Sequence, residues 1–206
     1  MSITTYSALK TAIADFLNRD DLAATVPTFI SLAEADINRR VRHWRMENRA
    51  TATLDGRYEA LPPRFLAPIR LSVTGDKIYQ LKPAGQSAML DLRSQSADQS
   101  GRPEYYALTK GELEFFPTPS DDYSLEMVYY EGVEPLSDSV ATNWLLTNYP
   151  DVYLYGSLVH TAPYLNDDQR TQVWAAFYQS AVDALDLDDQ AAKFGGVGLQ
   201  MKIRSY

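Results

Sequence analysis

The fold is decided by one stretch, residues 104–131, whose sequence is EYYALTKGELEFFPTPSDDYSLEMVYYE. Residues 105–108 and 112–116 are two apolar runs on either side of a turn at 110–111, which is typical of a β-hairpin. Residues 123–130 then alternate apolar and polar side chains, as a half-buried strand does. The stretch therefore predicts an antiparallel sheet in the middle of the chain.

The residues before this stretch continue the β pattern. Short period-two runs between 51 and 81 are divided by turn signals at Asp55-Gly56 and at 74–76. A short helix is expected at 84–93, followed by a polar loop. Together these runs predict a small antiparallel β-sandwich.

Helical periodicity occupies both flanks of this block. The first helix is expected to begin after an N-cap at Thr5, and the second to continue to about Arg45. After the β block, Pro150-Asp151 marks a third helix start, and 166–168 a fourth. Two of the predicted apolar stripes are Tyr6, Leu9, Ile13, Phe16 and Leu17 in the first helix, and Val173, Trp174, Phe177, Ala181 and Leu185 in the fourth.

The order of elements predicts an α+β fold, an α-helical bundle of about four helices with an inserted small antiparallel β-sandwich and an extended C-terminal arm. The expected parts are N-terminal helices at 1–45, the inserted β domain at 46–135, C-terminal helices at 136–187 and a docking arm at 188–206.

The C-terminal segment differs from the rest of the chain. Residues 190–206 carry three basic residues and no acid, and their glycines make a hinge. Alternation of apolar and polar side chains from Leu199 predicts a strand whose partner comes from another subunit. The residues assigned to partner binding are Phe194, Gly195, Gly196, Leu199, Met201, Ile203, Arg204 and Tyr206.

Composition argues against enzyme chemistry. The chain has no cysteine, which removes thiolate catalysis and cysteine-based metal sites. His43 and His160 are its two histidines, and neither has a metal-ligand or acid–base neighbour in the sequence. Four Asp-Asp pairs fall at predicted element boundaries, where aspartate caps helices and forms turns. We expect no catalytic residue, cofactor or metal, and no stretch reaches the roughly 18 apolar residues that cross a membrane.

Charge is distributed unevenly along the chain. Residues 1–103 hold 14 Lys and Arg against 11 Asp and Glu, whereas residues 104–206 hold 5 against 16. The total of −8 argues against tight DNA binding. The basic run Arg39, Arg40, Arg42 and Arg45 is either a solvated helix end that complements the helix dipole or a subunit interface.

Three segments resemble a known family, the head-to-tail adaptor (connector) proteins of short-tailed bacteriophages and gene-transfer-agent-like particles. They are AIADFLNRDDL with VPTFISLAEADINRRVR within 12–42, GRPEYYALTKGELEFFPTP at 101–119, and the segment from YSLEMVYYEG to TAPYL at 123–165. The likeness covers about residues 6–185. It lies in fold-level patterns rather than in catalytic signatures.

The resemblance implies a structural virion protein. Such proteins form a ring of about twelve copies between the portal and the tail nozzle, and DNA passes through the lumen without specific binding. The implied partners are the portal protein, the tail nozzle protein, further copies of the chain and tail fibres. Assembly would take place in the host cytoplasm and no membrane would be contacted.

Two other classes of function remain open at the level of sequence. One is a carbohydrate- or receptor-binding β-sandwich, whose platform would be the aromatic side chains Tyr105, Tyr106, Phe115, Phe116, Tyr123, Tyr129 and Tyr130. The other is a different head-completion ring protein. A carboxylate hydrolase is disfavoured because no pair of acids is placed to converge in a pocket.

Overall fold

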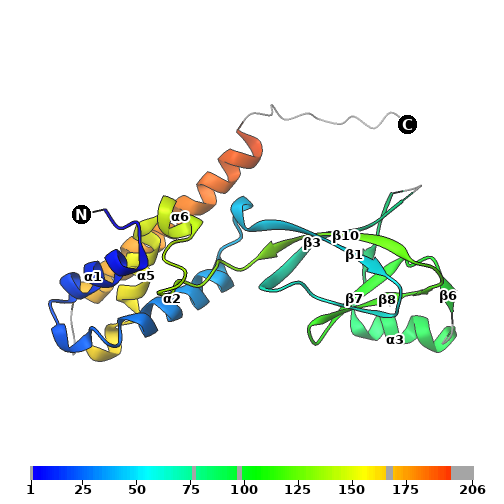
Figure 1. Ribbon diagram of the computed structural model, residues 1–206, viewed down its shortest axis with the longest axis horizontal. Helices are drawn as coiled ribbons and strands as arrows, with labels where there is room; N and C mark the ends of the chain where they lie inside the picture. Colours follow the sequence, from blue (N-terminus) through cyan, green and yellow to red (C-terminus); the bar gives the residue numbers. More distant parts are fainter. Residues whose placement is uncertain (1, 76–77, 97–98, 166–168, 196–206) are drawn as a thin grey trace. The chain divides into compact units, whose positions relative to one another are not determined.

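The computed structural model describes four stretches of the chain, residues 2–75, 78–96, 99–165 and 169–195. Of Asp20 only the backbone is described. The chain divides into two compact units (Figure 1). Unit 1 is built by the chain up to Met46 and from Val133 onward, and unit 2 is Glu47–Gly132. The fold is α+β: all the described strands lie in unit 2, and most helices in unit 1.

The first sheet of unit 2 has four strands in the order β1-β10-β3-β4. Their bounds are Glu47–Leu54 for β1, Tyr123–Glu131 for β10, Phe65–Thr74 for β3 and Tyr79–Gln80 for β4. The central strand β10 pairs antiparallel with both neighbours. Its buried residues are Leu125, Met127 and Tyr129, so the predicted alternation in this strand is confirmed.

The second sheet has the order β2-β8-β7-β5. Its bounds are Tyr58–Ala60 for β2, Glu112–Phe116 for β8, Tyr105–Thr109 for β7 and Lys82–Pro83 for β5. The predicted hairpin is confirmed, because β7 and β8 are antiparallel and Gly111 between them adopts a φ of 84°.

The expectation of purely antiparallel pairing is wrong in two places. β5 runs parallel to β7, and β6 (Ser100–Gly101) runs parallel to β9 (Thr118–Pro119). These pairs involve only two residues each and are joined by longer connections, which parallel neighbours require. The Asp55-Gly56 turn likewise links strands of different sheets rather than a hairpin.

A shared hydrophobic core joins the two sheets of unit 2. Leu71 and Leu125 come from the first sheet, and Leu113 and Phe115 come from the second. The helix α3 (Gln86–Gln95) packs on the second sheet through Met89, which is 1 % exposed. Burial of these alternating side chains fixes the register of both sheets, because a one-residue slip would turn them to solvent.

Unit 1 contains five α-helices among its described residues. Their bounds are Tyr6–Leu17 for α1, Val26–Arg40 for α2, Trp144–Asn148 for α4, Pro150–Val159 for α5 and Arg170–Phe194 for α6. Thr5 caps α1 by accepting from the Ala8 N–H at 3.2 Å, and α5 begins at Pro150, as the sequence predicts. α5 lies at the centre and contacts α1, α2, α4 and α6.

A buried polar group holds the segment that leads from Gly132 back into unit 1. Glu34 is 7 % exposed and accepts hydrogen bonds from the Leu136 N–H at 2.7 Å and the Tyr153 hydroxyl at 3.1 Å. Asn143 donates to the same hydroxyl at 2.7 Å. Burial raises the pKa of Glu34, although both hydrogen bonds lower it. This network fixes the connection that returns the chain to the helices.

Three sequence expectations about the helices are corrected by the structure. α2 ends at Arg40 rather than near Arg45. Phe16, placed on the buried stripe of α1, is 44 % exposed. α6 continues through Phe194, so residues 188–194 are helical instead of belonging to an extended arm.

Candidate docking surfaces

The four arginines assigned to an interface lie in different environments. Arg40 is held within the unit, since it bonds to Asp36 and Gln179 and its guanidinium lies 5.4 Å from the Tyr178 ring centre. Arg42 donates to two backbone carbonyls at 2.8 and 2.6 Å. The Arg39 side chain is 70 % exposed, and its ion pair with Asp36 is long, at 3.5 Å.

Arg45 is exposed as well, and its guanidinium lies 4.6 Å from the Trp44 ring centre. Arg40 is exposed too, with 39 % of its side chain accessible, but it is already bonded to Asp36 and Gln179. Arg39 and Arg45 therefore offer their charges to an outside partner most readily. Arg42 and Arg45 follow the end of α2, so they do not complement its dipole from inside the last turn.

His43 is a packed residue rather than an isolated one. It is 1 % exposed, and its ring stacks on Trp144 with centroids 5.2 Å apart. Its Nε2 lies 3.2 Å from Asp188 Oδ2, which also accepts a 2.5 Å hydrogen bond from the Tyr149 hydroxyl. The bonds from Tyr149 and His43 hold the pKa of Asp188 below its usual range.

This cluster ties the chain after α2 to the end of α6, and we name it the α6 clasp: His43, Trp44, Tyr149, Asp188 and Asp189. In it the Trp44 N–H donates to Asp189 Oδ1 at 2.6 Å. The prediction that the last Asp-Asp pair caps a helix is wrong, because both acids lie inside α6. His43 and Asp188 are 145 residues apart in sequence, so spacing alone gives no sign of the contact.

The two histidines do not form an acid–base site. The His43 ring is covered, and its Nδ1 accepts from the Arg45 N–H at 3.2 Å. His160 is half-buried, and that burial lowers its pKa. Within residues 2–75, 78–96, 99–165 and 169–195, no group of three or more histidines and acids could hold a metal ion.

Only the beginning of the proposed docking arm is described. Phe194 is the last residue of α6 and is 70 % exposed, and Gly195 follows as the C-cap. The remaining assigned residues lie outside the described part of the chain, namely Gly196, Leu199, Met201, Ile203, Arg204 and Tyr206. The α6 clasp thus fixes the helix from which this segment continues.

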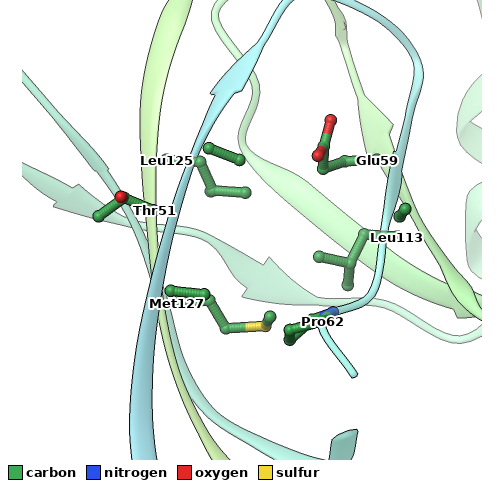
Figure 2. A pocket seen from close by; sticks show the side chains of 9 residues that line it. Thr51, Glu59, Pro62, Leu113, Leu125 and Met127 are labelled. Carbon is green, nitrogen blue, oxygen red and sulfur yellow. The ribbon is translucent and has the colours of Figure 1, made fainter. Parts of the chain in front are cut away.

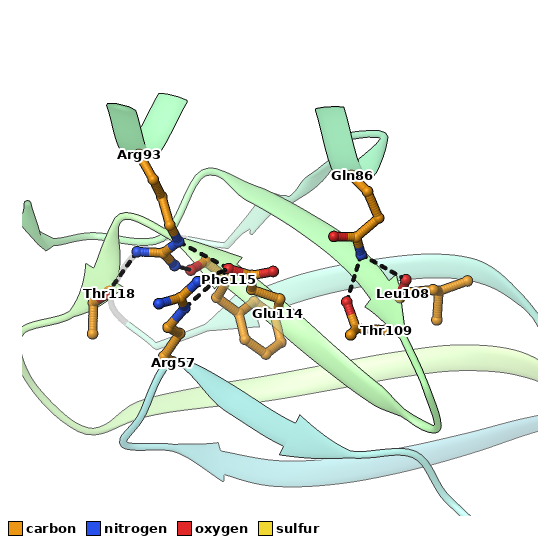
Figure 3. A network of polar contacts seen from close by, with 8 residues as sticks. All are labelled: Arg57, Gln86, Arg93, Leu108, Thr109, Glu114, Phe115 and Thr118. Carbon is orange, nitrogen blue, oxygen red and sulfur yellow. Dashed lines mark hydrogen bonds and ion pairs between the residues drawn. The ribbon is translucent and has the colours of Figure 1, made fainter. Parts of the chain in front are cut away.

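Unit 2 contains a buried charge network around Glu114 (Figure 3). Glu114 Oε1 accepts from Arg93 Nε at 2.8 Å and from Arg57 Nη2 at 2.6 Å. Arg93 also donates to the Phe115 carbonyl at 2.7 Å. Burial raises the pKa of Glu114, but the two arginines outweigh burial and hold it below its usual value. The network links α3 to β8 and supports the fold rather than reactive chemistry.

Figure 2 shows a small groove on unit 2, with a volume of about 180 Å³. Leu113, Leu125 and Met127 converge on it, and Glu59 is its one titratable lining residue. A single carboxylate among aliphatic side chains provides no acid–base pair.

The aromatic residues considered as a sugar platform are turned inward. Tyr106, Phe115, Phe116 and Tyr129 are buried, and Tyr105, Tyr123 and Tyr130 are half-buried. A stacking platform needs exposed ring faces, and none of these seven side chains is exposed. These side chains therefore belong to the core and to the partly covered faces of the sheets.

Among the described residues, exposed helix surfaces are available for contact, and the histidines and acids form no metal-binding cluster. Over the same part of the chain, no helix is both long and apolar enough to cross a membrane. The family model described as SU10 adaptor protein matches residues 4–199. No curated protein matches the chain. Since the family model covers nearly the whole sequence, the chain belongs to the SU10 adaptor protein family, a family of phage adaptors.

Proposed function

We propose that the chain is a structural subunit of the phage neck, which joins the portal to the tail nozzle as a ring of about twelve copies. The family match over residues 4–199 carries this proposal. The protein would reside in the virion after assembly in the host cytoplasm, and tail fibres would be further neighbours. It would act by binding, without catalysis or cofactor.

The exposed basic residues support a role between subunits. Arg39 and Arg45 are exposed, whereas Arg40 and Arg42 are held by hydrogen bonds to other residues of unit 1. We assign the subunit-interface role within the basic run to Arg39 and Arg45. Arg40 and Arg42 then act indirectly, by holding the end of α2 in place.

The C-terminal segment would dock on the portal. Leu199, Met201 and Ile203 alternate with polar residues, and such a segment can add a strand to another protein. Ordering a peptide segment costs free energy, which many simultaneous contacts around a ring would offset.

The negative charge of the chain suits a DNA channel. A chain of net charge −8 in a ring of about twelve copies gives a formal charge of about −96. Such a ring would repel the DNA backbone and allow it to slide. The channel would therefore be continuous without binding DNA specifically.

The test is a chain that ends at Gly195, mixed with the portal ring of the same phage. This end point keeps α6 whole, including the 3.1 Å ion pair between Lys193 and Asp189. We expect an unchanged circular dichroism spectrum and loss of portal binding in pull-down and native mass spectrometry. If the truncated chain binds the portal as well as the full chain does, the proposed docking role of the C-terminal segment is wrong.

A further inference from the structure

The long helix α6 has a second apolar stripe, which its own unit leaves uncovered. The buried stripe consists of Trp174, Tyr178, Ala181, Val182 and Leu185. On the other side, Val173 and Phe177 are 51 % and 50 % exposed, although the sequence pattern placed both in the core. Leu187 and Phe194 are 66 % and 70 % exposed.

These exposed residues share one face of the helix. The outer stripe consists of Val173, Phe177, Ser180, Ala184, Leu187, Ala191 and Phe194, all exposed and none charged. Their spacing alternates between four and three residues over the whole helix, which is the heptad pattern of a helix that packs on another helix. Apolar side chains gathered on one exposed face mark an interaction surface.

The shape of the outer stripe favours a helix as its partner. Ser180, Ala184 and Ala191 are small, so a second helix can approach between the larger side chains at an interaxial distance of about 8–10 Å. Among the described residues of unit 1, the one ring contact to this stripe is Tyr155 against Phe177, with centroids 5.1 Å apart. Most of the stripe is therefore free for another chain.

A second copy of the chain offers a matching helix. The outward face of α2 carries Thr28, Leu32, Ala35 and Arg39, and all four are exposed. Leu32 is 45 % exposed, although it is a large apolar residue. Apart from Leu32, this face carries small side chains, and it ends at the positive charge of Arg39.

The charges of the two faces are complementary. Asp183 is exposed beside the outer stripe, six residues after Phe177. Arg39 follows Leu32 by seven residues. At about 1.5 Å of rise per residue, these separations are about 9 and 10.5 Å along the helix axes, so a parallel pairing of Leu32 with Phe177 brings Arg39 close to Asp183.

We infer that the outer stripe of α6 in one copy binds the outward face of α2 in a second copy, with Arg39 facing Asp183. The two faces are different surfaces of one unit, so the contact is heterologous and can repeat around a ring. The inference rests on the proposed ring function and specifies the surface through which neighbours meet.

The absence of cysteine permits a direct test by disulfide cross-linking. The variant Leu32→Cys/Phe177→Cys is oxidised alone and after addition of the portal ring, and is then separated on a non-reducing gel. We expect a ladder of covalent species beyond the dimer. The matched control is Leu32→Cys/Ala175→Cys, because Ala175 is exposed on the same helix but lies about 160° around from Phe177. The control should give no ladder.

A second pair of variants tests the stripe without cross-linking. Phe177→Glu and Phe16→Glu place the same charge at exposed phenylalanines, 50 % and 44 % exposed, on α6 and α1. We expect Phe177→Glu to raise the concentration needed to fill the portal ring at least tenfold, and Phe16→Glu to change it less than twofold. Both variants should keep the wild-type circular dichroism spectrum.

The outcomes separate this inference from the proposed function. A wild-type chain that fills the portal ring while Leu32→Cys/Phe177→Cys gives no ladder would overturn the inference alone. Covalent dimers without longer species would also overturn it, because a two-fold contact does not repeat. A ladder from a chain that never binds the portal would uphold the contact and refute the function.

Discussion

Replacing Arg93 by Met should destabilise unit 2 far more than the same change at Arg57. Both guanidiniums bond to Glu114 Oε1, at 2.8 and 2.6 Å. They differ in burial: the Arg93 side chain is 10 % exposed and that of Arg57 is 42 % exposed. Methionine keeps the apolar part of either side chain and removes its donors, so the comparison isolates the polar contacts.

The magnitude follows from the bonds that each variant loses. Arg93→Met removes a charged bond to the buried carboxylate and leaves the Phe115 carbonyl without this donor. Breaking a buried ion pair costs about 3–5 kcal/mol. Arg57→Met removes a half-exposed pair, which solvent screens, and should cost about 1 kcal/mol or less. The variants should therefore differ by about 2–4 kcal/mol in free energy of unfolding.

Urea unfolding can measure this difference with two probes. All three tryptophans lie outside residues 47–132, so their fluorescence follows unit 1, whereas far-ultraviolet circular dichroism follows both units. With a slope of about 1–3 kcal/mol per molar urea, Arg93→Met should lower the midpoint of the dichroism transition by about 1 M or more. Equal midpoints for the two variants would refute the reasoning from burial.

Three further predictions concern pH and unit 1. Below about pH 4.5 the difference in free energy of unfolding between wild type and Arg93→Met should shrink, because Glu114 has a lowered pKa and its ion pair contributes stability only while the carboxylate is ionised. A difference that stays constant down to about pH 3 would contradict this prediction. Glu34 has a raised pKa, so the free energy of unfolding of the wild type should fall relative to that of Glu34→Gln as pH rises above about 4.5, where the unfolded chain already releases this proton. Urea midpoints that stay parallel for the two proteins would contradict a raised pKa. Asp188→Ala removes the acceptor of two clasp bonds and should lower the urea midpoint measured by tryptophan fluorescence, whereas Asp186→Ala, at an exposed neighbour, should leave the midpoint close to that of the wild type. Equal midpoints for the two variants would contradict a stabilising role of the α6 clasp.

Local pattern was sufficient for the central strands. Alternation in β10 and the Lys110-Gly111 turn are properties of adjacent residues, and the structure confirms both. The helix start at Pro150 and the cap at Thr5 are equally local, and both are confirmed.

The end of α2 could not be predicted from local sequence pattern. Apolar and basic residues continue the helical pattern to Arg45, yet the chain leaves the helix at Val41. The α6 clasp holds His43 and Trp44 through acids 145 residues away. Contacts between such distant residues have no signature in local periodicity.

The prediction of one buried stripe on α6 was wrong in part, for another reason. Val173 and Trp174 are neighbours in sequence, but one is 51 % exposed and the other 5 %. Two overlapping apolar stripes in one helix look like a single broad stripe until the packing of α5 is known. The docking arm depends on residues beyond Gly195, so its assignment remains a prediction.

The most direct measurement of the central claim is native mass spectrometry, with electron microscopy, of the full chain mixed with the portal ring of its phage. We predict a defined ring of about twelve copies seated on the portal. The result that would contradict the proposed ring is a chain that stays monomeric beside an empty portal ring, even when both proteins are more concentrated than in an assembling particle.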